Sequence, residues 1–331
     1  MSQIDLSVVI VSYNVRELLE RCLRSVVGDQ WLVVSNQWSV VRKTEELSTI
    51  PYPLSTEIFV VDNASHDGSA AMVRAKFPEV HLIENATNRG FAAANNQAFA
   101  LTRGRYVLML NPDTEVRAGA LETLVAFMDA HPRAGACGGK LVYGDGTLQH
   151  SAFAFPSLAQ IFLDFFPINW RLTESRLNGR YPRAWYARGA PFRVDHPLGA
   201  DFLVRRAAAE QVGWLDEQFF IYCEEIDWAI RLQRAGWEIW CVPQAEIVHY
   251  EAQSTRQFRE TMFVELWRAR ARLFRKHYSR AFWFVARQIV RAGLWNEARK
   301  ARAAARRGEV TQDELARRLD AYRQVWHNVG E

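Results

Sequence analysis

Short apolar runs alternate with amphipathic stretches through the first 140 residues of the chain. Runs rich in Val, Ile and Leu occupy residues 6–11, 58–61, 80–83 and 106–110. Such continuous runs are typical of strands that are buried on both faces of a sheet. Apolar residues at helical spacing lie between them, at residues 18–26, 69–76 and 92–101. This order predicts an α/β fold with a mostly parallel, Rossmann-like sheet and helices on both faces.

Polar residues directly follow three of the predicted strands. They are Ser12-Tyr13-Asn14, Asp62-Asn63 and Asn111-Pro112-Asp113. Sheets of this kind bind ligands at the carboxyl ends of their strands. We therefore expect these three groups to lie on one rim, which is the candidate ligand site.

Each polar group on this rim also has a purely structural interpretation. Tyr13-Asn14 fits an ordinary turn and helix cap, and Asp62 fits an Asx turn. Asn88-Arg89-Gly90-Phe91 fits a β-turn, but it can also bring backbone N–H groups and Arg89 close to a phosphate. A carboxylate at Asp62 can accept from a base or a ribose hydroxyl, and one at Asp113 suits Mg²⁺ or Mn²⁺.

Three carboxylates occur within four positions in Glu224-Glu225-Ile226-Asp227. The apolar run Phe219-Phe220-Ile221-Tyr222 leads into them, and an amphipathic stretch follows up to Gly236. Helix N-termini favour negative charge, so a charged cap is one interpretation. The apolar approach favours a desolvated carboxylate that serves as a general base, and the motif alone leaves both open.

Basic charge is concentrated at the C-terminal end of the chain. Residues 256–331 contain 18 Lys and Arg against 8 Asp and Glu, whereas residues 1–255 contain 23 against 29. Helical spacing, Trp, Phe and many Arg residues in this segment fit a helix in an anionic membrane interface. They equally fit a helical hairpin packed on the preceding domain. The segment after Ala298 is expected to be a solvated helix.

Several classes of protein lack support in the sequence. The four cysteines are widely spaced and form no CxxC pair, so we expect buried free thiols and no zinc site. Ser12-Tyr13-Asn14-Val15 provides neither the GxGxxG of a dinucleotide oxidoreductase nor the Gly-rich basic loop of a nucleotidyltransferase. No nucleic-acid-binding module accompanies the basic tail. We see no secretion signal and expect a cytoplasmic protein.

Taken together, the motifs resemble family 2 glycosyltransferases of the GT-A fold, notably the rhamnosyltransferase-like branch. The resemblance rests on residues 8–14, 60–69, 88–92, 110–113 and 199–202, on the acidic motif around Glu225, and on Val248-His249-Tyr250 ahead of Ser254-Thr255. It covers roughly residues 6–255. It implies a GT-A nucleotide-diphospho-sugar transferase domain over residues 1–255, with a nucleotide-binding half (1–140), an acceptor-binding half (141–255) and a basic helical extension (256–331).

The resemblance also implies roles for individual residues. The donor site would be formed by Ser12, Tyr13, Asn14, Asp62, Asn63, Asn88, Arg89, Gly90 and Asn111. Tyr13 and Asp62 would contact the base, and Asn88 and Arg89 would lie near the ribose and diphosphate. Asp113 and His249 would hold Mg²⁺ or Mn²⁺.

The remaining implied roles concern the acceptor and the proton. Glu225 would be the catalytic base, and Glu224 would position it. The acceptor site would be formed by Gly199, Ala200, Asp201 and Asp227. Asp227 and Arg231 are also four residues apart on one predicted helix, which favours an internal ion pair. The aromatic segment 150–198 would shape the acceptor site or pack as a flap.

Three features depart from the family pattern. The acidic motif is Glu-Glu where Glu-Asp or Asp-Asp is usual, and the metal motif reads Asn-Pro-Asp, so Asn111 is a weaker ligand than a carboxylate. The connection over residues 29–56 is longer than usual, and its role stays open.

The predicted activity is inverting, metal-dependent glycosyl transfer in cell-surface polysaccharide synthesis. The predicted donor is dTDP-L-rhamnose, with a UDP- or GDP-sugar as the alternative. A non-catalytic nucleotide-sugar-binding protein is the alternative from another class. The predicted acceptor is a saccharide or a polyprenyl-linked saccharide, and the predicted location is the inner face of the cell membrane, through peripheral contact. No nucleic-acid partner is expected.

Overall fold

The computed structural model describes residues 4–28, 54–250 and 259–330. Most of the 29–56 connection, together with Ser254 and Thr255, lies outside these residues. Up to residue 142 the elements are β1 (Leu6–Ser12), α1 (Arg16–Val27), β2 (Thr56–Asp62), α2 (Ser69–Lys76), β3 (His81–Glu84), α3 (Phe91–Phe99), β4 (Tyr106–Leu110), β5 (Thr114–Val116), α4 (Ala120–Ala130) and β6 (Ala134–Val142). The strands and helices predicted from the hydrophobic pattern of this region are confirmed.

Shorter elements follow and then give way to long helices. They are β7 (Leu148–Gln149), β8 (Ala152–Phe153), α5 (Leu158–Phe165), α6 (Trp170–Thr173), η1 (Arg176–Asn178), α7 (Arg183–Ala187), β9 (Phe192–Arg193), β10 (His196–Pro197), β11 (Asp201–Arg205), α8 (Arg206–Val212), α9 (Glu224–Arg234), β12 (Glu238–His249), α10 (Arg259–His277), α11 (Arg280–Arg306) and α12 (Gln312–Asn328).

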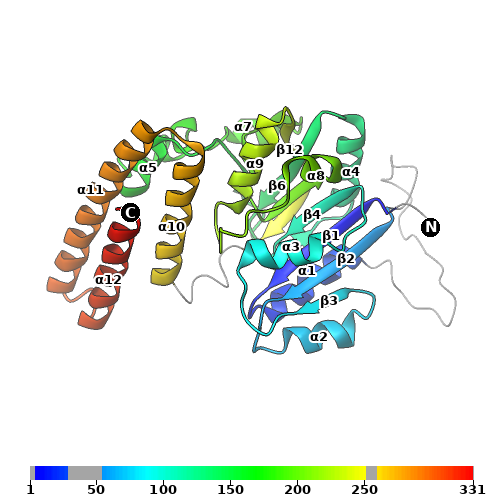
Figure 1. The fold of residues 1–331 in the computed structure, drawn as a ribbon, viewed down its shortest axis with the longest axis horizontal. Helices are drawn as coiled ribbons and strands as arrows, with labels where there is room; N and C mark the ends of the chain where they lie inside the picture. The colour runs from blue at the N-terminus through cyan, green and yellow to red at the C-terminus, as the bar shows by residue number, and fades with distance from the viewer. Residues whose placement is uncertain (1–3, 29–53, 251–258, 331) are drawn as a thin grey trace.

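A mixed sheet and the helices that flank it form one region, which we call the sheet region (Figure 1). Its main path through the described residues runs β3-β2-β1-β4-β11-β6-β12-β5. The first four strands of this path are parallel to one another, as are β6 and β12. In contrast, β11 is antiparallel to both of its neighbours, and β5 is antiparallel to β12. The predicted mostly parallel sheet is confirmed, with antiparallel strands only in its second half.

Residues 8–11 of strand β1 show why the middle of this strand is apolar at every position. Val8 and Ile10 belong to one hydrophobic cluster, whereas Val9 and Val11 belong to another. Successive side chains of a strand point to opposite faces, so a sheet covered on both faces needs apolar residues at every position. Helices α1, α2 and α4 contribute to the first cluster, and α3, α8 and α9 contribute to the second.

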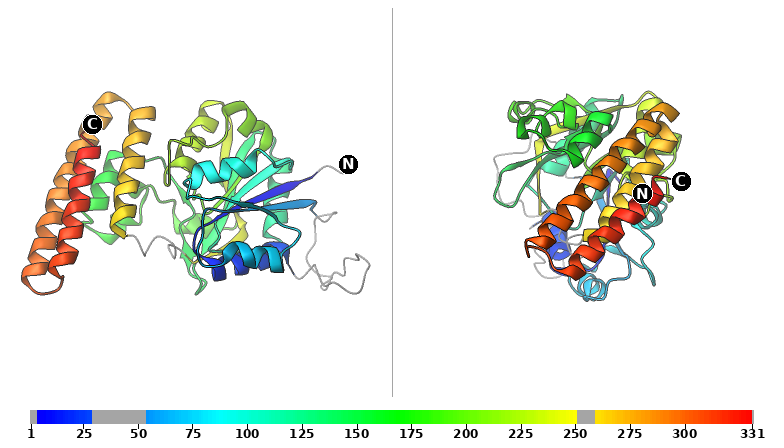
Figure 2. Two further views of the ribbon diagram at one scale, coloured as in Figure 1. Left: turned by 60° about the horizontal axis from the view of Figure 1, so that its bottom comes forward. Right: turned by 90° about the vertical axis from the view of Figure 1, so that its left-hand side faces the viewer.

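The C-terminal helices α10, α11 and α12 form a bundle beside the sheet region, as Figures 1 and 2 show. Their core is a third cluster that also includes residues of α5 and α9, such as Phe165 and Ile230. The ring of Phe165 stacks on Trp267 of α10 at 5.1 Å between centroids. The extension therefore packs on α5 and α9, as in the second of the two possibilities that the sequence left open.

Two expectations for the second half of the chain need correction. The segment after Ala298 is helical and largely solvated, as expected, but it is not solvated on all sides, because α12 buries Ala321 and Val325 in the bundle core. The aromatic segment 150–198 is not a flap with a core of its own. Tyr186 joins the core of the sheet region, and Phe165 joins that of the bundle.

Candidate functional site

The strand register brings the predicted donor residues to one rim of the sheet. Ser12, at the end of β1, is the register partner of Asp62, at the end of β2. Asn111 follows β4, and its backbone N–H donates to the carbonyl of Ala200 at 3.0 Å. Ligand-binding residues of parallel sheets are expected at this edge. The sequence prediction that these polar groups share a rim is therefore confirmed.

Two loops at this rim hold one another in place. Asn14 has a positive φ of 54°, its backbone N–H donates to Ser65 Oγ at 3.0 Å, and its side-chain oxygen accepts from the N–H of His66. One oxygen of Asp62 accepts from the N–H of Ser65 at 3.1 Å. The other oxygen of Asp62 is buried and has no hydrogen-bond partner among the described residues. Asp62 thus forms the Asx-type turn with one oxygen and leaves the other without a partner among the described residues.

Asn63 organises the loop that carries Asn88 and Arg89. Its amide nitrogen donates to Asn88 Oδ1 at 2.8 Å and to the carbonyl of Gly90 at 3.3 Å. Its oxygen accepts from the backbone N–H of Arg89 at 3.0 Å. Because these hydrogen bonds use the donors and the acceptor of its side chain, Asn63 holds the loop in its observed conformation.

Position 90 requires glycine, both because of its backbone conformation and because of its close neighbours. Its φ is +85°, and a Cβ at this position would lie 2.6 Å from both the ring and the carbonyl oxygen of Phe220. That carbonyl accepts from the N–H of Phe91 at 2.6 Å. The loop before α9 is therefore in direct contact with the loop expected to bind the donor, a contact that the sequence did not reveal.

Asp113 and His249 are brought together by the pairing of β5 with β12. His249 is the register partner of Thr114, and its Nε2 lies 3.3 Å from Asp113 Oδ1. Its Nδ1 lies 3.0 Å from Gln149 Oε1. Gln149 fixes the ring orientation as metal-bound histidines require, and sequence reasoning missed it because no motif surrounds it.

These residues fit one edge of a divalent-metal site. A carboxylate oxygen and an imidazole nitrogen are suitable ligands for Mn²⁺, and Asp113 alone suits Mg²⁺. Among the residues that the structure describes, no group of three or more His, Cys, Asp and Glu side chains could hold a metal ion. A metal held by Asp113 and His249 would therefore need further ligands, such as diphosphate oxygens and water.

The acidic motif opens helix α9 after an unusual backbone turn. Tyr222 and Cys223 have φ values of 70° and 67°, a region that residues other than glycine rarely adopt. Strained backbone of this kind clusters at functional sites, where the surrounding structure maintains it. The turn places Glu224 and Glu225 in the first turn of α9, where the helix dipole favours negative charge.

Both glutamates are buried, and burial raises the pKa of each carboxyl. The pKa of Glu225 rises to about 7, and that of Glu224 rises well above its ordinary value because the charge of Glu225 adds to the effect of burial. Gly199 lies against Glu225, since a Cβ there would be 3.5 Å from Glu225 Cγ. A carboxyl with a pKa near 7 can accept a proton at physiological pH.

Asp201 is a third buried carboxyl close to the rim. It begins β11 opposite Leu110, and one of its oxygens accepts from the backbone N–H of Gly139. Burial raises its pKa to about 6 in spite of that hydrogen bond. Its neighbours Gly199 and Ala200 connect it with Glu225 on one side and Asn111 on the other.

Asp227 does not fit the acceptor-binding role. Its side chain is fully buried, and its oxygens lie 2.8 Å from Arg231 Nε and 2.6 Å from both Lys276 Nζ and His277 Nε2. The predicted ion pair with Arg231 is confirmed. Burial opposes ionisation, but hydrogen bonds from His277 and Lys276 and the charge of Arg231 outweigh it and lower the pKa of Asp227 to about 2. Asp227 ties α9 to α10.

Unpartnered polar atoms gather at the same rim. Within the described part of the chain, buried oxygens without a hydrogen-bond partner include Ser12 Oγ, Asp62 Oδ1, Asp201 Oδ1, Glu224 Oε2 and Glu225 Oε2. Buried polar atoms normally have partners, and exceptions call for a functional explanation. These oxygens are suitable groups to bind a polar ligand.

Comparison with known protein families places this site in a known class. Residues 7–197 match the family described as "Glycosyl transferase family 2", and residues 106–303 match "Glycosyl transferase family group 2". The chain belongs to glycosyl transferase family 2. The chain is therefore an enzyme of the glycosyltransferase class, as the motifs predicted.

Curated relatives of this family 2 chain include several rhamnosyltransferases. The N-acetylglucosaminyl-diphospho-decaprenol L-rhamnosyltransferase of Mycobacterium tuberculosis (strain ATCC 25618 / H37Rv) is 31% identical over 218 residues, covering 60% of this chain and 67% of the relative. Rhamnosyltransferase WbbL of Escherichia coli (strain K12) is 25% identical over 211 residues, covering 61% and 72%. The rhamnosyltransferase-like resemblance is thereby confirmed.

Solved structures support the GT-A glycosyltransferase fold. A mannosyltransferase from Pyrobaculum calidifontis, solved in complex with GDP-Man and Mn²⁺, aligns with a TM-score of 0.54 and 18% identity, covering 100% of this chain and 85% of that one. GalNAc-T7, solved with UDP, GalNAc and Mn²⁺, aligns with a TM-score of 0.51 and 17% identity, covering 75% and 44%. At these identities the likeness concerns the fold alone.

None of the described helices of this family 2 chain combines the length and the apolar composition needed to cross a bilayer.

Proposed function

We propose that the protein is an inverting, divalent-metal-dependent glycosyltransferase that transfers L-rhamnose from dTDP-L-rhamnose. Its product belongs to cell-surface polysaccharide synthesis. The observation that carries the proposal is the buried Glu225, whose raised pKa suits proton transfer at neutral pH. The rim of Ser12, Asp62 and Asp113 supports a nucleotide-sugar donor, because it offers carboxylates to a base or ribose and to a metal.

The proposed reaction is a single displacement. The oxygen of the acceptor hydroxyl attacks the anomeric carbon while the bond from that carbon to the diphosphate oxygen breaks, and the electron pair leaves with the nucleoside diphosphate. The hydroxyl proton passes to the carboxylate of Glu225. Glu224 lies beside Glu225, and the raised pKa of its carboxyl favours its neutral form next to the ionised base. Attack opposite the leaving group inverts the anomeric configuration.

The leaving diphosphate needs charge neutralisation. Asp113 and His249 are the residues that would hold Mg²⁺ or Mn²⁺, with Gln149 orienting the imidazole. When bound, the metal supplies Lewis-acid stabilisation of the diphosphate. Two solved glycosyltransferases of the same fold contain Mn²⁺, which supports this part of the proposal.

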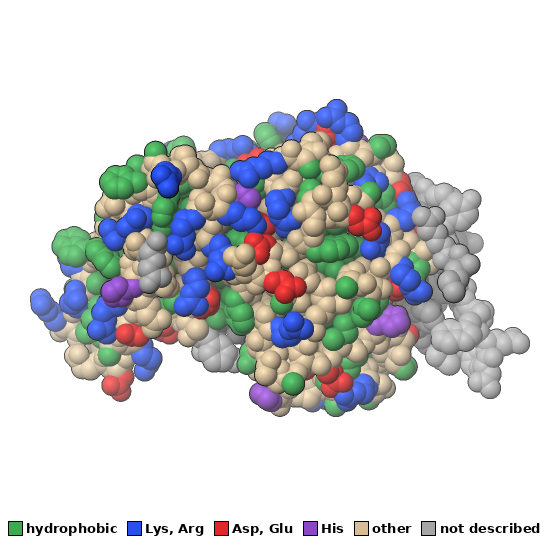
Figure 3. All heavy atoms as spheres, viewed as in Figure 1, with side chains coloured by type: hydrophobic (Ala, Val, Ile, Leu, Met, Phe, Trp, Pro, Cys, Tyr) green, Lys and Arg blue, Asp and Glu red, His purple; other side chains and the backbone are tan. Residues whose placement is uncertain are grey.

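The proposed donor and acceptor rest on the relatives. Three of them are named as rhamnosyltransferases, including the dTDP-rhamnosyl transferase RfbF of Shigella flexneri. The name of the M. tuberculosis relative specifies a saccharide linked through diphosphate to decaprenol. We extend this to a polyprenyl-linked saccharide acceptor here, and to peripheral binding at the cytoplasmic face of an anionic membrane. The Lys and Arg side chains on the bundle in Figure 3 support that location.

Nucleotide release from dTDP-, UDP- and GDP-sugars, with Mn²⁺ or with EDTA, tests the proposal. We expect release of dTDP from dTDP-L-rhamnose, its loss with EDTA, and its loss in Asp113→Ala. Release from a UDP- or GDP-sugar would preserve the mechanism and overturn the rhamnose donor. Nucleotide-sugar binding without turnover, even with a lipid-linked acceptor, would instead indicate a non-catalytic binding protein.

A further inference from the structure

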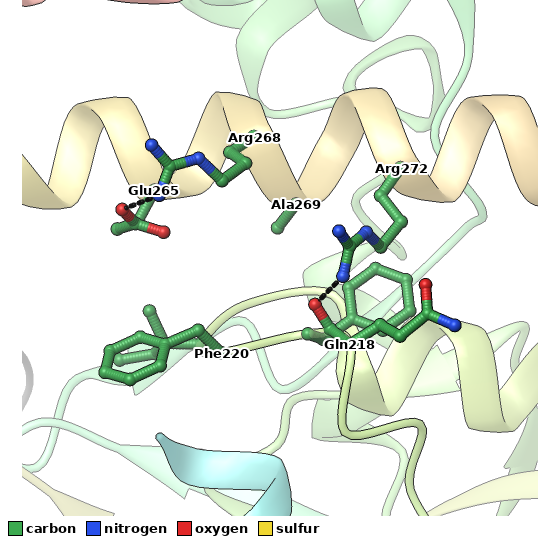
Figure 4. Close-up of a pocket in the computed structure, with 8 residues that line it drawn as sticks. Gln218, Phe220, Glu265, Arg268, Ala269 and Arg272 are labelled. Atoms are coloured by element: carbon green, nitrogen blue, oxygen red, sulfur yellow. Dashed lines mark hydrogen bonds and ion pairs between the residues drawn. The ribbon is translucent and has the colours of Figure 1, made fainter. Parts of the chain in front are cut away.

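A groove lies between helix α10 and the loop that leads into α9. It has a volume of about 280 Å³. Residues 218–221 form one wall, and Glu265, Arg268, Ala269 and Arg272 of α10 form the other. Figure 4 shows the two walls facing each other, with Phe220 below the α10 side chains. None of these α10 residues belongs to the rim described above.

The groove lies next to both halves of the proposed reaction centre. Only Tyr222 and Cys223 separate its loop wall from Glu224 and Glu225. On the other side, the ring and carbonyl of Phe220 contact Gly90 of the loop expected to bind the donor. A molecule seated in the groove would therefore contact the segment that leads into the proposed base, without occupying the donor rim.

The charges on the α10 wall favour an anion. Among the described residues that line the groove, Glu265 is the one carboxylate beside Arg268 and Arg272, and it lies 2.5 Å from Arg268. Arg272 donates to the backbone carbonyl of Gln218. A guanidinium has five N–H donors, so each arginine retains groups for phosphate oxygens. The Arg268 side chain is 53% exposed and available to a ligand from solution.

The loop wall adds an apolar component. Phe220 is 44% exposed, although it adjoins the buried Phe219, and Ala269 opposite is buried. An exposed ring beside two arginines suits an amphiphile that carries negative charge at one end. A neutral saccharide would not require the arginines, and inorganic phosphate would not require the ring.

The groove is fixed relative to the catalytic helix. Asp227 of α9 pairs with Lys276 and His277 of α10, and Lys276 also pairs with Asp216 at 2.7 Å. The position of the arginines on α10 is therefore coupled to that of Glu225. This rigidity is what an acceptor site needs in order to orient a hydroxyl toward a base.

Building on the proposed function, we propose that this groove binds the diphosphate of a prenyl-diphosphate-linked saccharide acceptor. Arg268 and Arg272 contact the phosphate oxygens, and Phe220 packs against the apolar part of the ligand. The saccharide extends from the groove toward Glu225.

Calorimetry with farnesyl diphosphate as the probe, at saturating dTDP to fill the donor site, tests this inference. We expect Arg268→Gln to weaken binding at least about tenfold, because it removes a charge-assisted contact. Arg272→Lys keeps the charge and should weaken binding less than Arg272→Gln. The matched control is Arg275→Gln, an exposed arginine of α10 whose guanidinium lies over Trp283 of α11, away from the groove.

Three outcomes would overturn the inference. In the first, Arg268→Gln and Arg272→Gln bind farnesyl diphosphate as tightly as the wild type does. In the second, the wild type binds inorganic diphosphate as tightly as farnesyl diphosphate. In the third, the two variants lose only the binding of phosphatidylglycerol vesicles. The last would assign the arginines to a membrane surface.

Binding of dTDP is measured separately in every variant. Its absence in the wild type would contradict the proposed function, whereas the effect of the arginines on farnesyl diphosphate binding is read independently.

Discussion

At the scale of single residues, the pKa values of Glu224 and Glu225 are shifted in the opposite direction from that of nearby Asp227. Glu224 and Glu225 are buried and have no cation at hydrogen-bond distance among the residues that the structure describes, and their pKa values rise. Asp227, on the same helix, is surrounded by three basic side chains, and its pKa falls. The sequence shows three similar acids, and their different surroundings distinguish the proposed proton acceptor, Glu225, from Asp227, which forms a structural ion pair.

Glu225→Gln should reduce kcat by at least about 100-fold, because it removes the proton acceptor. In the wild type, kcat should increase as the pH rises through about 7, where Glu225 loses its proton. Transfer to an acceptor across pH 5–9 is the measurement, with Glu217→Gln on the exposed part of the preceding loop as the control. A pH profile that is unchanged in Glu225→Gln would contradict the assignment.

The same substitution should stabilise the fold at high pH. The pKa of Glu225 in the folded state, about 7, exceeds the value of about 4.3 for an unfolded chain. The stability associated with the neutral carboxyl is therefore fully present below about pH 4 and lost as the pH rises through 7. Glu225→Gln should raise Tm by a few degrees at pH 8 and show little change at pH 4.

Asp227→Asn should have the opposite effect on stability. We expect a loss of about 2–4 kcal/mol in the free energy of unfolding at pH 7, because Arg231, Lys276 and His277 lose a buried partner. The folded-state pKa of Asp227 is lowered, so its stabilisation is present above about pH 4 and lost as the pH falls through 2.

Urea denaturation at pH 7 and at acidic pH measures this difference. The control is Asp320→Asn, which removes an exposed pair with Arg323 and should change stability by less than about 0.5 kcal/mol. Equal effects of Asp227→Asn and Asp320→Asn at pH 7 would show that the buried network does not stabilise the fold.

At the scale of elements, the loop before α9 lies between the helical bundle and the loop around Gly90, which is expected to bind the donor. Phe220 contacts Gly90 on one side, and its neighbours in residues 218–221 face α10 on the other. The positive φ values of Tyr222 and Cys223 then turn the chain into α9. No local pattern predicts this arrangement, because it depends on three segments that are distant in sequence.

Gly90→Ala should weaken nucleotide binding by about tenfold or more. The added Cβ would overlap Phe220, and the φ of +85° is unfavourable for alanine, so the loop has to move. Gly146→Ala is the matched control, since Gly146 has a φ of +81° but no atom within 4 Å of the added Cβ. Calorimetric titration with dTDP compares the two, and similar affinities in both variants would exclude the contact with Phe220 as the cause.

At the scale of the whole molecule, the helical extension is part of one structure with the sheet region. The bundle core includes Phe165 from α5 and Phe219, Cys223 and Ile230 from the sheet region around α9. Figure 2 shows the long helices lying side by side next to the sheet region. Contacts of this kind couple the stability of the bundle to the geometry of the site.

Gly293→Val should lower Tm by several degrees. Gly293 of α11 lies directly against the ring of Phe165 in α5, so a larger side chain would separate the two helices at a cost of about 1–3 kcal/mol. Ala292→Val, on the exposed face of α11, is the control for helix propensity. Thermal unfolding of both variants is the measurement. If Gly293→Val and Ala292→Val unfold at the same temperature, the packing of α11 on α5 does not limit stability.

The sequence by itself determined the strands and helices of the first 140 residues and the rim at which the polar groups meet. Hydrophobic periodicity and the order of the elements along the chain can be read directly from the sequence. The continuous apolar run in β1 already indicated a sheet that is covered on both faces. The motifs also determined the family, because polar residues such as Asp62 and Asp113 occur at or shortly after the ends of strands.

Only the tertiary structure decided which residues surround each side chain. The burial of Glu225, the partners of Asp227 and the glutamine beside His249 depend on residues up to 100 positions away. It also decided that the basic helices pack on α5 and α9, since amphipathic helices with aromatic and Arg residues suit a protein core or a membrane surface equally well. Local sequence describes a helix face, whereas long-range packing determines what covers that face.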